Sequence, residues 1–115
     1  MDIKKLLKLT ESDYLDFKQQ WYENNADLIH DILCLSNSLS ENKERFIIIG
    51  VKENSKTKLK KLYCIKNDKN KKTEADILTL LRGSNMNYFP KIEVLKHSVK
   101  GNYIDCIKIT PFLEH

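Results

Sequence analysis

The most constraining feature of this chain is one uninterrupted apolar run, Phe46-Ile47-Ile48-Ile49-Gly50-Val51. Most of its residues are β-branched, and the absence of polar alternation is typical of a strand that is buried on both faces. Such a strand needs other layers above and below it, so it must lie in the middle of a sheet. The run therefore predicts a sheet-based core with its central strand over residues 46–51.

The segments around this run supply the other layers. Leu15 and Phe17 alternate with polar residues and predict a short strand over 15–18. We expect a helix over 25–38 after an asparagine cap, and a second helix over 73–83 that begins at Thr73 with Asp76. An edge strand is expected at 62–65, and a strand pair at 91–99 and 102–110. The order β-α-β-β-α-β-β predicts an α+β fold with two helices packed on a mixed sheet.

Length and composition narrow the function classes. The 115 residues suffice for one domain, which we place at residues 1–112; Leu113-Glu114-His115 is similar to an expression-tag remnant. With three glycines and no Gly-x-x-x-x-Gly-Lys-Ser/Thr loop, the domain lacks an ATP-binding loop. No apolar run approaches the ~20 residues of a membrane helix, so we expect no membrane partner. The three cysteines form no Cys-x-x-Cys pair, which predicts buried, reduced thiols in a cytoplasmic protein.

Positive charge is concentrated in one segment. Residues 52–72 hold nine lysines against two acidic residues, whereas acidic side chains outnumber basic ones over residues 1–45. A localised basic segment is a candidate contact for the phosphates of a nucleic acid. A solvated, lysine-rich hairpin that only keeps the protein in solution is the alternative. The candidate phosphate contacts are Lys18, Arg45, Lys52, Lys56, Lys58, Lys60 and Lys61.

Three motifs resemble one known family. They are Glu11-Ser12-x-x-Leu15-Asp16-Phe17-Lys18, the helical stretch ending in Ser36-Asn37-Ser38, and Ile47-Ile48-Ile49-Gly50-Val51-Lys52-Glu53. Together they resemble the Schlafen AlbA-type domain, often the N-terminal module of larger bacterial proteins, over residues 9–111. The chain departs from the family pattern at Asp16, where Glu is usual, and at Glu53, where Asp is usual. It also lacks the glycines that normally flank the central strand.

The resemblance implies two functions. Bacterial members are described as DNA-binding or regulatory domains, and animal relatives include endoribonucleases that cut structured RNA with three carboxylates and a divalent metal. Mapped onto this chain, the trio is Glu11, Asp16 and Glu53, with Mg²⁺ or Mn²⁺ as the metal. Residues five apart on a uniform strand face opposite sides of a sheet. Glu11 can therefore join Asp16 only if the chain bends near Ser12.

Three functions follow from these observations. The leading one is a nucleic-acid-binding, regulatory module of a larger bacterial protein, which needs no cofactor and acts with downstream domains. The second is a Schlafen-type endoribonuclease at Glu11, Asp16 and Glu53, which alone requires Mg²⁺ or Mn²⁺; we favour binding over catalysis. The third is a protein-interaction or homodimerisation module that uses the edge strand at 62–65, or Tyr14 or Tyr88.

Overall fold

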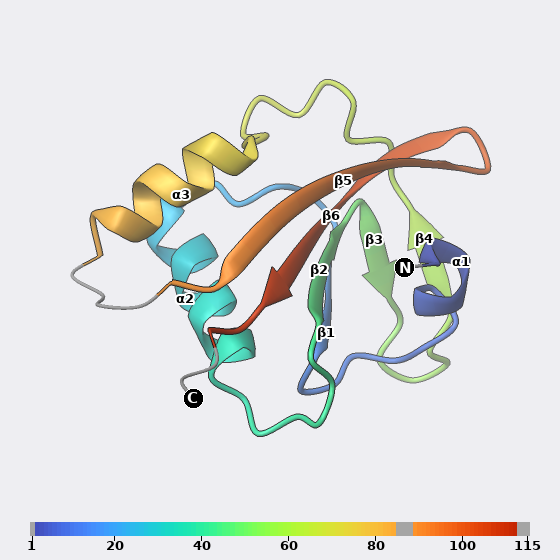
Figure 1. Cartoon of the computed structure of the whole chain (residues 1–115). Coiled ribbons are helices and arrows are strands. Elements are labelled where there is room, and N and C mark those ends of the chain that lie inside the picture. Colours follow the sequence, from blue (N-terminus) through green and yellow to red (C-terminus); the bar gives the residue numbers. More distant parts are fainter. Residues whose placement is uncertain (1, 85–88, 113–115) are drawn as a thin grey trace.

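A computed structural model describes residues 2–84 and 89–112 (Figure 1). The main sheet has four strands in the order β1-β2-β6-β5, in which β1 and β2 are parallel and the other pairs are antiparallel. A separate two-stranded sheet pairs β3 with β4. The strands are β1 (Leu15–Lys18), β2 (Arg45–Ile49), β3 (Val51–Glu53), β4 (Lys60–Leu62), β5 (Lys91–Val99) and β6 (Asn102–Thr110). The helices are α1 (Ile3–Leu6), α2 (Asn25–Ser36) and α3 (Glu74–Arg82).

These elements confirm the predicted α+β class with a mixed sheet, but two of the predicted strands differ from those observed. The strand predicted over 46–51 is two strands, because the chain leaves the main sheet at Gly50. The strand predicted at 62–65 lies at 60–62 and pairs with β3 instead of joining the main sheet. Leu113–His115 and Tyr88 lie outside the described residues.

Gly50 makes this break possible. Its φ is +107°, a conformation that residues with a side chain rarely adopt. A Cβ atom at this position would lie 2.8 Å from both Ile104 Cγ2 and the carbonyl oxygen of Tyr63. The Gly50 N–H donates to the Lys18 carbonyl of β1, and the Gly50 carbonyl accepts from the Tyr63 N–H. Gly50 therefore links the main sheet to the small sheet at a point where backbones approach closely.

The predicted burial of the central strand on both faces is confirmed. Ile47, Ile48 and Ile49 have no exposed surface. Ile47 and Ile49 pack in the cluster that contains the buried residues of α2 and α3, and both helices lie on the same side of the sheet (Figure 1). Ile48 packs on the other side, in the cluster that contains Leu6 of α1 and Val51 of β3.

Both long helices begin as their sequences predict. The Asn24 side chain accepts a hydrogen bond from Ala26 N at 2.7 Å. Thr73 and Asp76 form a reciprocal capping box at the start of α3. These caps determine the residue at which each helix begins, and therefore where the preceding loop ends.

The three cysteines differ in solvent exposure. Cys106 is buried in β6, as predicted, and burial raises its pKa to about 12. Cys34 on α2 and Cys64 after β4 are exposed, so the expectation of three buried thiols was wrong for these two. The apolar neighbours in the sequence do not decide which way a side chain at the end of an element points.

Candidate nucleic-acid interface

The basic surface is built on the β3–β4 hairpin. Lys52 lies opposite Lys61 across the two strands, and both side chains are exposed. Like charges at directly opposed positions destabilise a strand pair. Lys52 and Lys61 therefore add positive potential to the outer face of the hairpin at a cost in stability.

The tip of this hairpin is an ordered turn. The Asn54 side chain accepts hydrogen bonds from the backbone N–H groups of Lys56 and Thr57 at 2.9 and 3.0 Å. Asn54 N–H also donates to the Leu59 carbonyl, and Lys58 adopts a positive φ of 61°. With its backbone satisfied in this way, the turn presents Lys56 and Lys58 to solvent. Their ammonium groups extend the charge of Lys52 and Lys61.

Lys60 differs from the other hairpin lysines. Its ammonium nitrogen lies 3.2 Å from Glu53 Oε2 and 5.0 Å from the centroid of the Phe17 ring. Only 11% of the Lys60 side chain is exposed. The Lys60 ammonium thus forms an ion pair with Glu53 and a cation–π contact with Phe17. We therefore treat Lys60 as a residue that holds the hairpin against β1.

Lysines from the two ends of the chain meet beside this hairpin. A hollow of about 520 Å³ lies where α1, β4 and the β5–β6 turn come together. Its apolar residues are buried or half-buried, whereas Lys4, Lys8 and Lys100 are exposed and form a basic rim, and no acidic residue lines it. The residues around it are Lys4, Leu7, Lys8, Lys60, Leu62, Ser98, Val99 and Lys100. Lys4, Lys8 and Lys100 were not predicted from the sequence, because only the fold brings them to the hairpin.

Besides Lys60, two more of the predicted phosphate contacts have other partners. Arg45 is only 5% exposed, and its guanidinium donates to backbone carbonyl oxygens of Leu35, Ser36, Ser38, Ser40 and Asn42. It therefore holds the end of α2 and the following loop, and we withdraw it from the interface. The Lys18 ammonium lies between Asp16 at 3.3 Å and Asp31 at 3.4 Å. A phosphate there would also face two carboxylates.

The bend that the carboxylate trio requires is present. Ser12 N–H donates to the Leu15 carbonyl at 2.9 Å, so the chain turns back on itself before β1. This turn places Glu11 alongside β1, where Oε1 accepts from the Phe17 N–H at 3.4 Å. Asp16 is on the neighbouring position of the same strand, and β3 with Glu53 packs nearby.

The charges of the trio influence one another. Partial burial raises the pKa of Glu11, and the negative charges of Asp16 and Glu53 raise it further. The hydrogen bond from Phe17 and the charge of Lys18 act in the opposite direction. Asp16 is paired with Lys18 and Glu53 with Lys60, so two of the three carboxylates already have a cation beside them.

A family model matches nearly the whole of this chain. The model described as Schlafen, AlbA_2 covers residues 11–115. The chain belongs to this family. The matched segment includes Glu11, both sheets, α2 and α3, while α1 precedes it. A search of curated proteins finds no match. At the level of the family, the Schlafen AlbA_2 assignment makes this a nucleic-acid-related domain.

The metal implied by the Schlafen resemblance does not fit the carboxylates as they stand. Across residues 2–84 and 89–112, no group of three or more His, Cys, Asp or Glu side chains is arranged to hold a metal ion. A divalent ion at the trio would have to compete with the ammonium groups of Lys18 and Lys60. The carboxylates of Asp16 and Glu53 are therefore engaged in ion pairs and do not form a ready-made metal site. In the same described part of the chain, no helix has the length and apolar character needed to cross a membrane.

Proposed function

We propose that this Schlafen AlbA_2 domain binds the phosphate backbone of nucleic acid through the β3–β4 hairpin and the lysines beside it. The observation that carries the proposal is the basic rim around the hollow, which joins α1, β4 and the β5–β6 turn without an acidic residue. Gathering like charges costs free energy, and a polyanion offsets that cost. The proposed contacts are Lys4, Lys8, Lys52, Lys56, Lys58, Lys61 and Lys100.

The direct test is binding of the whole chain to labelled DNA and RNA at increasing salt. Contacts to phosphates release counterions, so the logarithm of the affinity should fall linearly with the logarithm of the salt concentration. Affinity that is unchanged between about 50 and 200 mM salt would contradict the proposal. Contacts to the phosphate backbone carry little sequence information, so we expect binding that depends weakly on sequence. The proposed role is a DNA-binding, regulatory module of a cytoplasmic bacterial protein whose other domains provide the response.

A second candidate function is cleavage of RNA at Glu11, Asp16 and Glu53. It is favoured by the turn at Ser12, which places Glu11 alongside β1, and it requires Lys18 and Lys60 to release Asp16 and Glu53 to the metal. The test is incubation of structured RNA with the protein and Mn²⁺. Cleavage that disappears in Asp16→Asn would support the nuclease, and no cleavage by the wild type would contradict it.

Self-association is the third proposal, and it uses the edge of the small sheet. Among the residues that the structure describes, β4 pairs with β3 alone, so its other side is a candidate for pairing with a second copy. Tyr14, the other candidate contact, is half-buried and packs against the core cluster of Phe17 and Ile48. Sedimentation of the whole chain tests this proposal, because a monomer at all concentrations would contradict it.

A further inference from the structure

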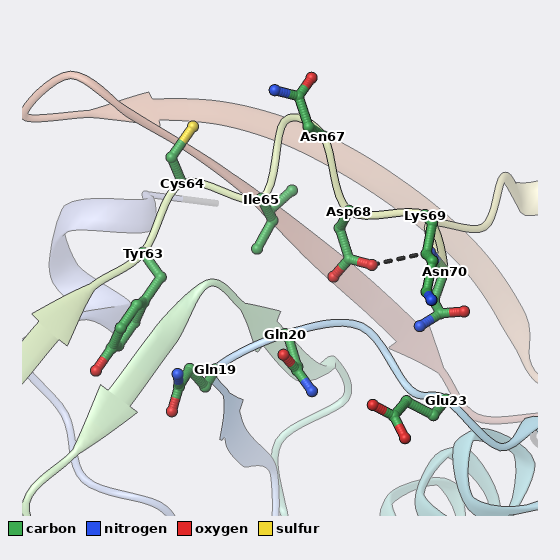
Figure 2. A pocket seen from close by; sticks show the side chains of 10 residues that line it. All are labelled: Gln19, Gln20, Glu23, Tyr63, Cys64, Ile65, Asn67, Asp68, Lys69 and Asn70. Atoms are coloured by element: carbon green, nitrogen blue, oxygen red, sulfur yellow. Dashed lines mark hydrogen bonds between the residues drawn. The ribbon is translucent and has the colours of Figure 1, made fainter.

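A second hollow opens beyond the end of β4. It has a volume of about 550 Å³, within the range of small-ligand sites, and lies between residues 19–23 and the loop 63–70 (Figure 2). Gln19, Gln20 and Glu23 form one wall, and Tyr63, Asp68 and Asn70 are in the other. The hollow therefore combines amide groups, carboxylates and one aromatic ring.

The two walls are fixed to each other. Trp21 N–H donates to Asp68 Oδ2 at 2.8 Å and joins the two segments, and Asn70 N–H donates to Asp68 Oδ1 at 2.8 Å. Ile65, which is 4% exposed, anchors the loop in the core, and its N–H donates to the Tyr103 carbonyl. Both Asp68 oxygens accept hydrogen bonds from backbone N–H groups, so Asp68 holds the loop 63–70 against residues 19–23.

The amide side chains remain available. Within the described residues, the side chains of Gln19, Gln20 and Asn70 make no hydrogen bond to the protein. Each amide offers two donors and one acceptor oxygen, the same kinds of group that the edge of a nucleobase presents. Figure 2 shows Gln19 and Gln20 on the segment that lies opposite the loop with Tyr63 and Asp68. These groups are placed to bind a planar, polar heterocycle.

The rim of the hollow continues the basic surface. The Lys61 ammonium lies 5.3 Å from the centroid of the Tyr63 ring, so a hairpin lysine touches the aromatic lining of the hollow. Lys69 lines the hollow, and Lys66 projects from the same loop with its ammonium 5.3 Å from the Tyr103 ring centroid. A phosphate backbone bound at Lys61 would therefore bring its bases to the mouth of this hollow.

We propose that the hollow takes one unpaired nucleobase, which stacks on Tyr63 while Gln19 and Gln20 hydrogen-bond to its edge. This inference rests on the proposed nucleic-acid binding and names the class of nucleic acid. Bases inside a duplex are stacked and paired and cannot enter a side pocket without being flipped out. The domain should therefore prefer single strands, loops or bulges to fully paired duplex.

The test compares a labelled single strand with its fully paired duplex on the whole chain at low salt. We expect tighter binding of the single strand, and an approximately tenfold loss of that binding in Tyr63→Leu and in Gln19→Ala/Gln20→Ala. Duplex affinity should stay unchanged in both variants. Asn42→Ala is the matched control, because it removes an exposed amide outside the hollow. The glutamine variant changes only exposed side chains and so leaves the fold intact.

Alkylation of the cysteines gives a second readout. Cys64 lines the hollow and is exposed, whereas Cys34 is exposed on α2 and serves as the internal control. A bound single strand should slow alkylation at Cys64 and leave Cys34 unaffected. Equal affinity for single strand and duplex, with no effect of the variants, would overturn the base pocket and leave the phosphate surface standing. No binding of either form at low salt would overturn the proposed function and the base pocket together.

Discussion

The ammonium of Lys60 lies 3.2 Å from the carboxylate of Glu53, and about nine-tenths of each side chain is buried. These residues are opposite one another on β4 and β3, and Lys60 also covers the Phe17 ring of β1. The pair thus connects the small sheet that carries the basic surface with the main sheet. It also keeps the Glu53 charge balanced in a place that water hardly reaches.

Replacing Lys60 alone should therefore destabilise the domain. Lys60→Met leaves the buried Glu53 carboxylate without its cation, and breaking such a pair costs about 3–5 kcal/mol. Urea unfolding measures the loss. Lys61→Met is the matched control: this neighbour in the strand is exposed, so the free energy of unfolding should change by less than about 0.5 kcal/mol. Restoration of stability by adding Glu53→Gln to Lys60→Met would identify the unbalanced carboxylate as the cause, and equal effects at the two lysines would contradict it.

Gly50→Ala should be more damaging than Gly101→Ala. Both glycines have a positive φ, so either substitution introduces backbone strain of about 1–2 kcal/mol. At Gly50 the new methyl group also meets Ile104 and the Tyr63 carbonyl at 2.8 Å, whereas nothing lies within 4 Å at Gly101. We expect an additional destabilisation of about 1–3 kcal/mol at Gly50. Denaturant midpoints of the two variants test this, and equal midpoints would mean that the main sheet and the small sheet do not approach closely at Gly50.

The Glu11 carboxylate should make stability fall as pH rises. Its pKa is raised above the ordinary 4.5 by partial burial and by Asp16 and Glu53, so the folded protein binds this proton more tightly than the unfolded chain. Between 4.5 and the raised value, the folded state carries more protons, and its stability declines with increasing pH. Glu11→Gln keeps the acceptor for Phe17 N–H and removes the charge. The variant should be more stable than the wild type at pH 7 and should lose that advantage below pH 4.5; a variant that is less stable at pH 7 would contradict the assignment.

The fold class was predictable because its signals are local. The run of Ile47, Ile48 and Ile49 has no polar face, and Thr73 with Asp76 indicates a helix start, so each element can be recognised within a few residues. The break at Gly50 was not predictable in this way. The φ angle of Gly50 cannot be predicted from the apolar residues around it. Only glycine fits there because Ile104 and Tyr63, from distant parts of the chain, approach its backbone closely.

The site was predictable only in part, for a similar reason. A lysine-rich segment is visible in the sequence, but whether a given lysine reaches solvent depends on the strand face, as Lys60 and Lys61 demonstrate. Arg45 follows a polar loop and resembles a surface residue, yet the last carbonyl groups of α2 converge on it. Lys4 and Lys100 are near opposite ends of the sequence, so no local pattern could place them in one rim.

The central claim is that a defined surface, and not the overall positive charge, binds nucleic acid. Two variants with the same change in net charge separate these explanations. Lys56, Lys58 and Lys61 are changed to Glu in one variant, and three exposed lysines away from the hairpin, Lys43, Lys91 and Lys96, are changed to Glu in the other.

The measurement is the slope of log affinity against log salt concentration for one labelled nucleic acid. The hairpin variant should bind weakly and with a flatter slope, by about one unit for each phosphate that the protein no longer neutralises, while the control variant keeps most of the affinity and slope of the wild type. Equal reductions of affinity in the two variants, or no reduction in either, would contradict the account.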